Sequence, residues 1–258
     1  MSAIYAGSLV DIMEKAFGPA FAKATGYPFE GFGGGSNEDA AAIKGRVRTG
    51  DVFVSAAASA DRELEGAGNG DWVSWYTTAF SSELVMGYNP KSQAGRELKA
   101  RKPWYEVLAK HASEVGRTDP KEDPKGRLTV EAIDAAAKKL HDPALTKTLS
   151  SMPEFEETAM LARLQSGQLE AGFFYVAEAK ESHVSTVSIK PAYKYADYTV
   201  TILNHAENPA GAEAFVGYLL GPRRRGVMKQ YGLVPIKPKF SGSASAVPKG
   251  LRGILGAN

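Results

Sequence analysis

The 258-residue chain contains no cysteine and four scattered histidines. The missing cysteines exclude a disulfide framework, a thiolate metal site and a cysteine nucleophile. The histidines lack the HxxxH spacing of a metal site, so we expect no resident metal and no cofactor. No apolar run in the sequence is long enough to cross a bilayer as a helix.

Short motifs of common enzyme classes are also missing: there is no GxxxxGK[ST] loop, no GxSxG elbow and no HExxH pair. The run Gly31–Ser36 is similar to a dinucleotide fingerprint, with Asp51 about twenty residues further on. Asp51 opens the next predicted strand, however, whereas the fingerprint needs its acidic residue after that strand. We therefore expect a protein that is not an enzyme, and keep a nucleotide-dependent enzyme built on Gly31–Ser36 as a weaker alternative.

A large excess of one charge is missing as well. The formal net charge is +2, and lysine and arginine are mixed with acidic residues along the sequence. This composition gives no argument for a nucleic-acid partner. The one dense basic run, Arg223–Arg225, precedes a helical pattern, and we interpret it as the solvated start of a helix.

What the chain does contain is an alternation of strand-like and helical patterns. Strands are predicted at residues 4–6, 27–32 and 51–56, with amphipathic helical patterns between them. This order predicts an α/β fold with a parallel sheet covered by helices. The apolar run Ala171–Val176 is typical of a further strand buried on both faces.

Two turns, Gly7-Ser8 and Gly35-Ser36, stand where a predicted strand ends and a helical pattern begins. A helix N-terminus has unpaired N–H groups and partial positive charge, and a serine hydroxyl adds another donor for an anion. Each serine could equally do no more than cap its helix. Two such turns in adjacent strand-helix units favour a binding site for a small oxyanion, because ligands bind at the carboxyl ends of such strands.

Residues 117–126 combine two prolines, three acids and three bases. Proline restricts its own backbone and that of the residue before it. We expect this stretch to be an exposed turn without regular structure.

The chain resembles the substrate-binding proteins of molybdate and tungstate ABC importers, including the archaeal tungstate-binding branch. The resemblance extends over nearly the whole length. It is carried by the two serine turns, the strand after Gly50, the Asp-Pro loop, the strand after Leu164 and the stretches around Tyr195 and Pro235. The matching runs are Ala6–Leu9, Gly35-Ser36, Gly50–Ala56, Gly116–Gly126, Leu164–Gly167, Ala171–Tyr175, Lys194–Tyr198 and Gly232–Ile236.

The resemblance implies the two-lobed periplasmic binding protein fold of type II. Each lobe would hold a mixed, mostly parallel sheet flanked by helices, and the chain would cross between lobes twice. Residues 1–79 and 199–258 would form lobe I, and residues 80–198 would form lobe II.

The resemblance also implies a set of ligand-binding residues in the cleft between the lobes. Lobe I would give hydroxyl and backbone donors, and lobe II would give the Asp-Pro-Lys segment, the backbone near a phenylalanine and a tyrosine hydroxyl. In the tungstate branch a Glu in the strand equivalent to 173–175 helps to complete a six-coordinate centre; here that position is Phe174, whose side chain would narrow one wall. The implied residues are Ser8, Ser36, Asp123, Pro124, Lys125, Phe174 and Tyr195.

The function that the resemblance implies is transport. We expect an extracytoplasmic, monomeric binding protein whose leader peptide has been removed, which passes a tetrahedral oxyanion to an ABC permease. Molybdate and tungstate are the first expectations for the ligand. Sulfate, phosphate or another small anion is the alternative, because the sequence does not measure the size of a cleft.

Overall fold

The computed structural model describes residues 1–257, which divide into two compact units. Unit 1 comprises Met1–Ser81 together with the chain from Asp197 onward, and unit 2 comprises Ser82–Ala196. Strands β4 (Trp75–Tyr88) and β9 (Tyr195–Ile202) both run through the division. The crossings lie two residues from the boundaries expected from the sequence, at 79 and 199.

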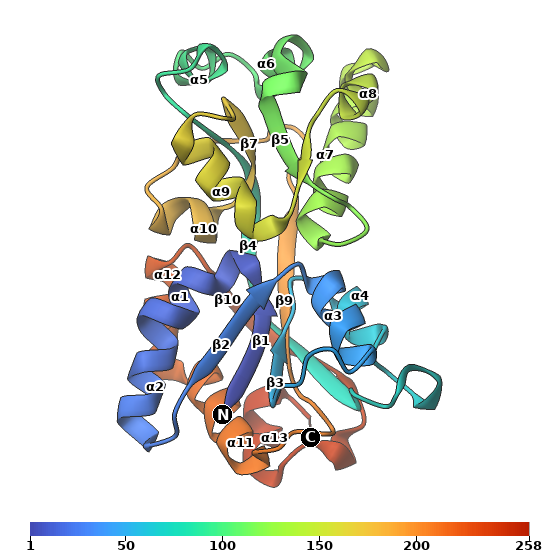
Figure 1. Ribbon diagram of the computed structural model, residues 1–258, viewed down its shortest axis with the longest axis vertical. Helices are drawn as coiled ribbons and strands as arrows, with labels where there is room; N and C mark the ends of the chain where they lie inside the picture. The colour runs from blue at the N-terminus through green and yellow to red at the C-terminus, as the bar shows by residue number, and fades with distance from the viewer. Residues whose placement is uncertain (258) are drawn as a thin grey trace. The chain divides into compact units, whose positions relative to one another are not determined.

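Unit 1 is built on the parallel strands predicted at the start of the chain (Figure 1). Strand β1 pairs with β2 and β3 in parallel, β3 pairs with β9 antiparallel, and β10 pairs antiparallel with β4. Its elements besides β4 and β9 are β1 (Ser2–Ala6), η1 (Gly7–Leu9), α1 (Val10–Ile12), η2 (Met13–Phe17), α2 (Gly18–Thr25), β2 (Glu30–Gly34), α3 (Ser36–Lys44), β3 (Val52–Val54), α4 (Ala58–Arg62), η3 (Ala67–Asn69), α11 (Pro209–Leu220), η6 (Pro222–Arg224), α12 (Arg225–Gln230), β10 (Val234–Gly242), η7 (Ala244–Ala246), η8 (Lys249–Leu251) and α13 (Arg252–Leu255).

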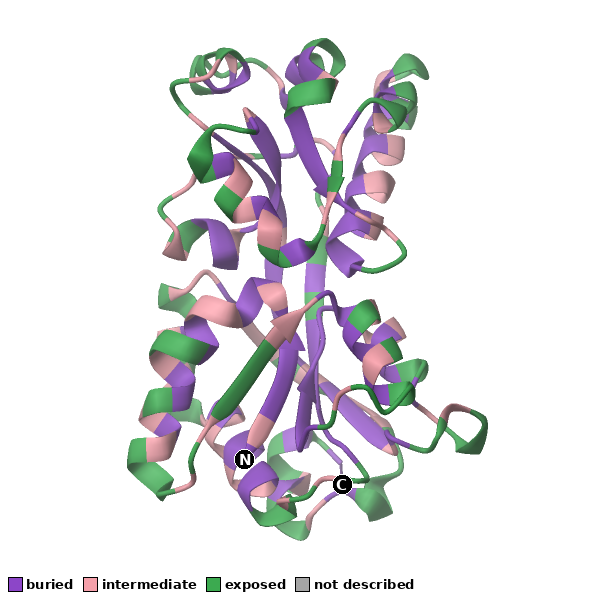
Figure 2. Ribbon diagram, viewed as in Figure 1, coloured by how far each residue is buried: buried purple, intermediate pink, exposed green. Residues whose placement is uncertain are grey.

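The burial pattern explains which strands could be predicted accurately from the sequence. Strand β3 is fully buried and β1 nearly so, whereas the edge strand β2 is largely exposed (Figure 2). The predicted strand at 27–32 is shifted to Glu30–Gly34, since a glycine-rich exposed edge has little apolar pattern to fix its ends. The helix after it begins at Ser36, directly behind the turn.

Unit 2 joins antiparallel and parallel pairs around β4. Strand β4 pairs antiparallel with β7 and with β8, and β5 pairs in parallel with β6 and β7. Its remaining elements are α5 (Gln93–Lys99), α6 (Trp104–His111), η4 (Ala112–Glu114), β5 (Val115–Thr118), α7 (Pro124–Leu140), α8 (Ala144–Lys147), η5 (Thr148–Ser150), β6 (Glu154–Phe155), α9 (Glu157–Ser166), β7 (Ala171–Tyr175), α10 (Val176–Glu181) and β8 (Ser185–Ser188).

Strand β7 is buried along its whole length, as its apolar run predicts. Phe174 packs in a core cluster with Met160 and Leu164, and Phe173 meets the ring of Trp104 edge to face, with centroids 5.9 Å apart. Neighbouring side chains of a strand point to opposite faces, so β7 has apolar partners on both.

The expectation that residues 117–126 hold no regular structure is wrong at both ends. Strand β5 continues to Thr118, and α7 begins at Pro124. Proline suits the first position of a helix, because its missing N–H would have no intrahelical partner there and its backbone angle is already helical.

None of the helices formed by residues 1–257 combines the length and apolar content needed to cross a membrane. Within the same residues, no group of three or more histidine, cysteine or acidic side chains is arranged to hold a metal ion.

Candidate functional site

In unit 1 the two serine turns occupy equivalent places in the sheet. The parallel register pairs Ala6 with Gly34, and each serine lies two residues beyond its strand's last paired residue. The third turn, which comes after β3, lies beside the first, because Tyr5 of β1 pairs with Val54 at the end of β3. The turns after β1, β2 and β3 therefore gather at one edge of the sheet, where their helix N-termini present N–H groups.

Ser8 is buried, and its hydroxyl forms a hydrogen bond of 2.9 Å with the hydroxyl of Tyr198 on β9. The ring of Tyr198 stacks on Phe80 with centroids 5.2 Å apart, which fixes its direction. No side-chain cap is formed at the start of η1. One of these two hydroxyls donates to the other, so the pair can offer no more than one proton to an oxyanion.

Ser36 is also buried, and it connects two turns. Its hydroxyl accepts a hydrogen bond of 3.0 Å from the backbone N–H of Ala56, beyond the end of β3. The residue at the N-cap of α3 is Gly35, and no side chain caps this helix. The reading in which both serines merely cap helices is therefore wrong, and the proton of the Ser36 hydroxyl is available to an acceptor.

A buried carboxyl group stands behind the third turn. Oδ2 of Asp61 accepts from the hydroxyls of Thr199, at 2.5 Å, and Ser55, at 3.0 Å, while Oδ1 has no hydrogen-bond partner. Burial raises the pKa of Asp61 to about 7, because the interior disfavours its ionised form more than the two hydroxyls favour it. This network ties the turn after β3 to the crossing strand β9.

In unit 2 the equivalent position is the N-terminus of the 17-residue helix α7, which follows β5. Asp123 is the N-cap residue, and Gly126 packs so closely that an added Cβ would lie 2.4 Å from the carbonyl oxygen of Thr118. The loop therefore needs glycine there. Oδ2 of Asp123 and Oγ1 of Thr118 are both buried without a hydrogen-bond partner.

Burial raises the pKa of Asp123 to about 6, although the nearby ammonium group of Lys125 lowers it. The carboxyl group can therefore exist in either protonation state near neutral pH. When ionised it is an acceptor, and when protonated it can also donate a hydrogen bond.

Lys125 is fully buried in an ion-pair cluster. Its Nζ lies 3.0 Å from Oε1 of Glu157 on α9 and 2.9 Å from Oε1 of Glu178 on α10. Glu178 also accepts a 2.7 Å hydrogen bond from the backbone N–H of Tyr175. The pKa of Lys125 is raised by these acids despite burial, and burial raises the pKa of Glu157 to about 7. The lysine thus holds the starts of three helices together, and its charge is already compensated.

The structure corrects the expectation that the side chain of Phe174 narrows a wall of the site. That side chain is completely buried in the core cluster of unit 2, so its backbone alone could meet a ligand. Pro124 is buried at the start of α7. Tyr195 is 52% exposed and belongs to unit 2, and the tyrosine that bonds to Ser8 within unit 1 is Tyr198.

The nucleotide alternative loses its structural basis. Residues 31–34 lie within strand β2 itself, where a phosphate-binding loop would have to leave the strand. Asp51 precedes β3 and accepts hydrogen bonds from the backbone N–H groups of Ser2 and Asn208. It therefore anchors backbone at the amino end of β3, away from the serine turns.

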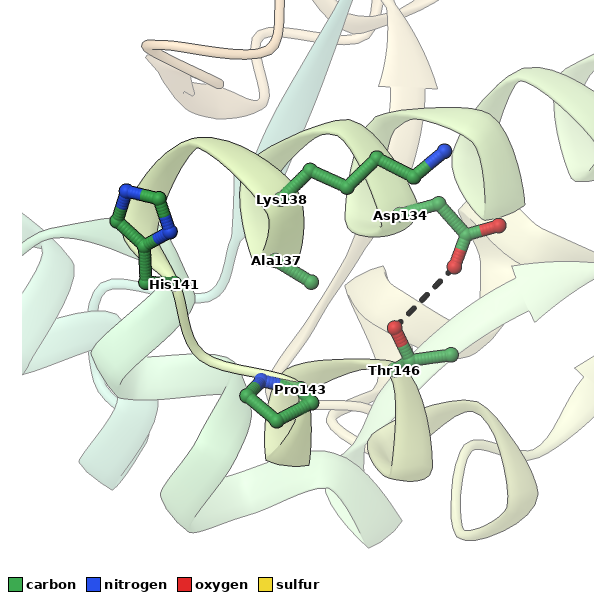
Figure 3. A pocket seen from close by; sticks show the side chains of 6 residues that line it. All are labelled: Asp134, Ala137, Lys138, His141, Pro143 and Thr146. Atoms are coloured by element: carbon green, nitrogen blue, oxygen red, sulfur yellow. Dashed lines mark hydrogen bonds between the residues drawn. The ribbon is translucent and has the colours of Figure 1, made fainter.

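A shallow pocket lies at the other end of α7, beside α8 (Figure 3). Asp134 and Thr146 face each other across it with a 3.2 Å hydrogen bond. Carbonyl groups gather at a helix C-terminus and disfavour anions there, so this pocket does not match the chemistry of the serine turns. It is lined by Asp134, Ala137, Lys138, His141, Pro143 and Thr146.

Sequence reasoning missed several polar residues at these two edges. Tyr198 and Thr199 follow Tyr195 in the same strand, and a helix-start acid such as Glu178 gives a weak signal by itself. The missed residues are Ser55, Asp61, Thr118, Glu157, Glu178, Tyr198 and Thr199.

A family model described as bacterial extracellular solute-binding protein matches residues 2–234 of the chain. A protein of Haloferax volcanii, provisionally named an ABC transporter molybdenum-binding protein, is 32% identical over 149 residues. That match covers 57% of this chain and 46% of the relative.

Two solved structures are similar over most of the chain. The periplasmic molybdate-binding protein of Azotobacter vinelandii has a TM-score of 0.70 at 19% identity, covering 91% of this chain and 98% of that one. The sulfate-binding protein of Mycobacterium tuberculosis has a TM-score of 0.67 at 15% identity, covering 98% and 90%. At these identities the likeness shows a shared fold, that of periplasmic binding proteins, and leaves the ligand open.

Proposed function

Because the chain belongs to the bacterial extracellular solute-binding proteins, we propose that it binds a tetrahedral oxyanion and delivers it to an ABC permease. Molybdate or tungstate is the ligand we propose first. The observation that supports an oxyanion is the pair of buried serines at equivalent register positions, Ser8 and Ser36, each behind a parallel strand. The name of the Haloferax relative supports molybdate.

Unit 1 offers neutral donors of the kind that suit a dianion. The hydroxyl of Ser36, one hydroxyl of the Ser8–Tyr198 pair and the N–H groups of the turns can donate to an oxyanion. A lysine or arginine in the same place would bring its own cost of desolvation. Neutral donors bind the charge without that cost.

Unit 2 would complete the site by closure about the two crossing strands, β4 and β9. We propose that the segment Asp123–Lys125 contributes the backbone N–H of Lys125 at the start of α7, together with the hydroxyl of Thr118. Pro124 has no N–H, and that of Asp123 donates to the carbonyl oxygen of Asp119. Tyr195 and the backbone at Phe174 keep the roles that the family resemblance predicts. Lys125 acts indirectly, because its ammonium group is held by two carboxylates.

A second candidate ligand is an oxyanion that keeps a proton, such as phosphate. The observation that favours it is Oδ2 of Asp123, a buried oxygen without a hydrogen-bond partner that could accept that proton. Asp123→Asn should then abolish a preference for phosphate while sparing molybdate and sulfate, which have no proton to offer near neutral pH.

The proposal is tested by thermal unfolding of ligand-stripped protein with molybdate, tungstate, sulfate or phosphate added at equal concentration. A ligand at about a hundred times its Kd stabilises the fold by about 2.7 kcal/mol. Ser8→Ala should weaken binding by about 1.5 to 3 kcal/mol, the usual contribution of a hydrogen bond to a charged group. The exposed Ser113→Ala is the matched control. A protein stabilised by none of the four anions would contradict the proposal.

A further inference from the structure

The C-terminal part of unit 1 differs in charge from the rest of the chain. Residues 214–258 contain eight lysines and arginines and no acidic residue. The segment thus carries a formal charge of +8. Because the net charge of the whole chain is +2, residues 1–213 carry a net charge of −6. The mixing of charges expected from the whole-chain composition fails here. We call residues 214–257 the basic segment.

Most of these charges are directed to solvent. Six basic side chains of the segment are exposed, and one of them, Lys229, has an interaction partner. Within residues 1–257 no carboxylate forms an ion pair with any of the other five. Arg224 instead lies over the ring of Tyr218, with its guanidinium carbon 4.1 Å from the ring centroid. The five are Arg223, Arg225, Lys237, Lys239 and Lys249.

The basic residues lie on elements that contact one another. Strand β10 contacts both α12 and α13, and α12 and α13 follow η6 and η8 directly. Two aliphatic side chains on these elements are also exposed, Val234 by 55% and Ile254 by 38%. The surface therefore combines cations with exposed aliphatic groups.

Protection of an edge strand explains part of this pattern. Lysine and proline on an edge such as β10, with the sequence VPIKPKFSG, prevent pairing with another chain. Arg223, Arg225 and Lys249 lie outside that strand and need another explanation. A nucleic acid is disfavoured as partner, because the exposed large apolar residues here are aliphatic and cannot stack on bases as aromatic rings do.

We propose that the basic segment is a surface that binds anionic phospholipid headgroups. A cluster of four to eight lysines and arginines gains affinity for an anionic bilayer with each residue that reaches the surface. Exposed aliphatic side chains such as Val234 and Ile254 add contact with the boundary of the acyl chains. Such binding would hold the protein beside the membrane in which a permease resides.

The test is sedimentation of the full chain with phosphatidylcholine vesicles that contain about a third phosphatidylglycerol, at low ionic strength. The wild type should bind these vesicles and not pure phosphatidylcholine, and about 0.5 M salt should release it. Replacing four of the exposed basic residues should lower the bound fraction more than about tenfold. The variant is Arg225→Gln, Lys237→Gln, Lys239→Gln and Lys249→Gln.

The matched control removes the same number of exposed lysines and arginines from unit 2 and should change binding less than about twofold. Equal losses in the two variants would mean that net charge alone is sensed, and would overturn the proposal. Failure of the wild type to bind anionic vesicles would overturn it too, and would leave an acidic protein as partner; this result does not depend on how well either variant folds. The control is Lys91→Gln, Lys99→Gln, Arg101→Gln and Lys147→Gln.

Discussion

The two units place different chemistry at the same topological position. At the carboxyl ends of its strands, unit 1 carries hydroxyls and backbone N–H groups, with Ser8 and Ser36 in register. At the corresponding end of β5 and β7, unit 2 carries Lys125 between two glutamates, and the buried carboxyl group of Asp123. One unit is rich in neutral donors, and the other holds compensated charges.

This difference shows that a helix N-terminus at such an edge does not by itself predict a ligand contact. In unit 2 the carboxylate of Glu178 accepts from the backbone N–H of Tyr175 at the start of α10, where an external anion would otherwise bind. The buried ammonium group then compensates the acids. In unit 1 no side chain caps η1 or α3, whereas unit 2 uses Glu178 to cap the start of α10.

The largest effect should come from Lys125→Met in unit 2. Removing the ammonium group leaves Glu157 and Glu178 buried without their cation, which should cost about 3 to 5 kcal/mol of the free energy of unfolding. Urea denaturation measures the change. The exposed Lys138→Met on the same helix should stay within about 0.5 kcal/mol of wild type. Equal stability of both variants would show that the cluster is solvated.

The next largest effect is on the pH dependence of stability, to which each unit contributes one buried carboxyl group. Burial raises the pKa of Asp61 in unit 1 to about 7, and that of Asp123 in unit 2 to about 6. The folded state therefore keeps protons that the unfolded chain loses above about pH 4. The stability from each group is complete below its unfolded pKa, and is lost as pH rises through the folded pKa.

Asp61→Asn should therefore reduce the loss of stability between about pH 4 and pH 7.5 by on the order of 3 kcal/mol. Asparagine still accepts from Ser55 and Thr199 but does not ionise. Asp123→Asn should flatten the profile separately, and the double variant should add the two effects, because the groups lie in different units. If the free energy of unfolding of Asp61→Asn falls with pH as steeply as that of the wild type, the pH dependence comes from other groups and the prediction is wrong.

The sequence predicted features that local pattern controls. Apolar runs and small-residue turns located β1, β3 and β7, and the serines fall at equivalent positions because strand and turn lengths match. The cluster in unit 2 could not be predicted in this way. Lys125 lies 32 and 53 residues from its partners Glu157 and Glu178, and nothing local marks a contact at that separation.

The positive charge of the basic segment is visible in the sequence, but the net charge of the whole chain hides it.

Which tyrosine of β9 contributes its hydroxyl to the site could not be predicted for a different reason. Tyr195 and Tyr198 are three residues apart, so in a strand they point to opposite faces. The pairing of β9 with β3 decides which of these faces is directed toward Ser8. That pairing joins residues far apart in the chain.

The smallest effect we predict concerns that choice. Tyr198→Phe removes the hydroxyl that bonds Ser8 and keeps the ring that stacks on Phe80, so oxyanion affinity should fall by about 1.5 to 3 kcal/mol with little change in stability. Tyr195→Phe removes an exposed hydroxyl of unit 2 and should weaken binding less if unit 1 supplies most of the donors. Calorimetric titration of both variants with molybdate compares the two units directly. A larger loss for Tyr195→Phe would place the decisive hydroxyl in unit 2, and would reverse the contrast between neutral donors and compensated charges.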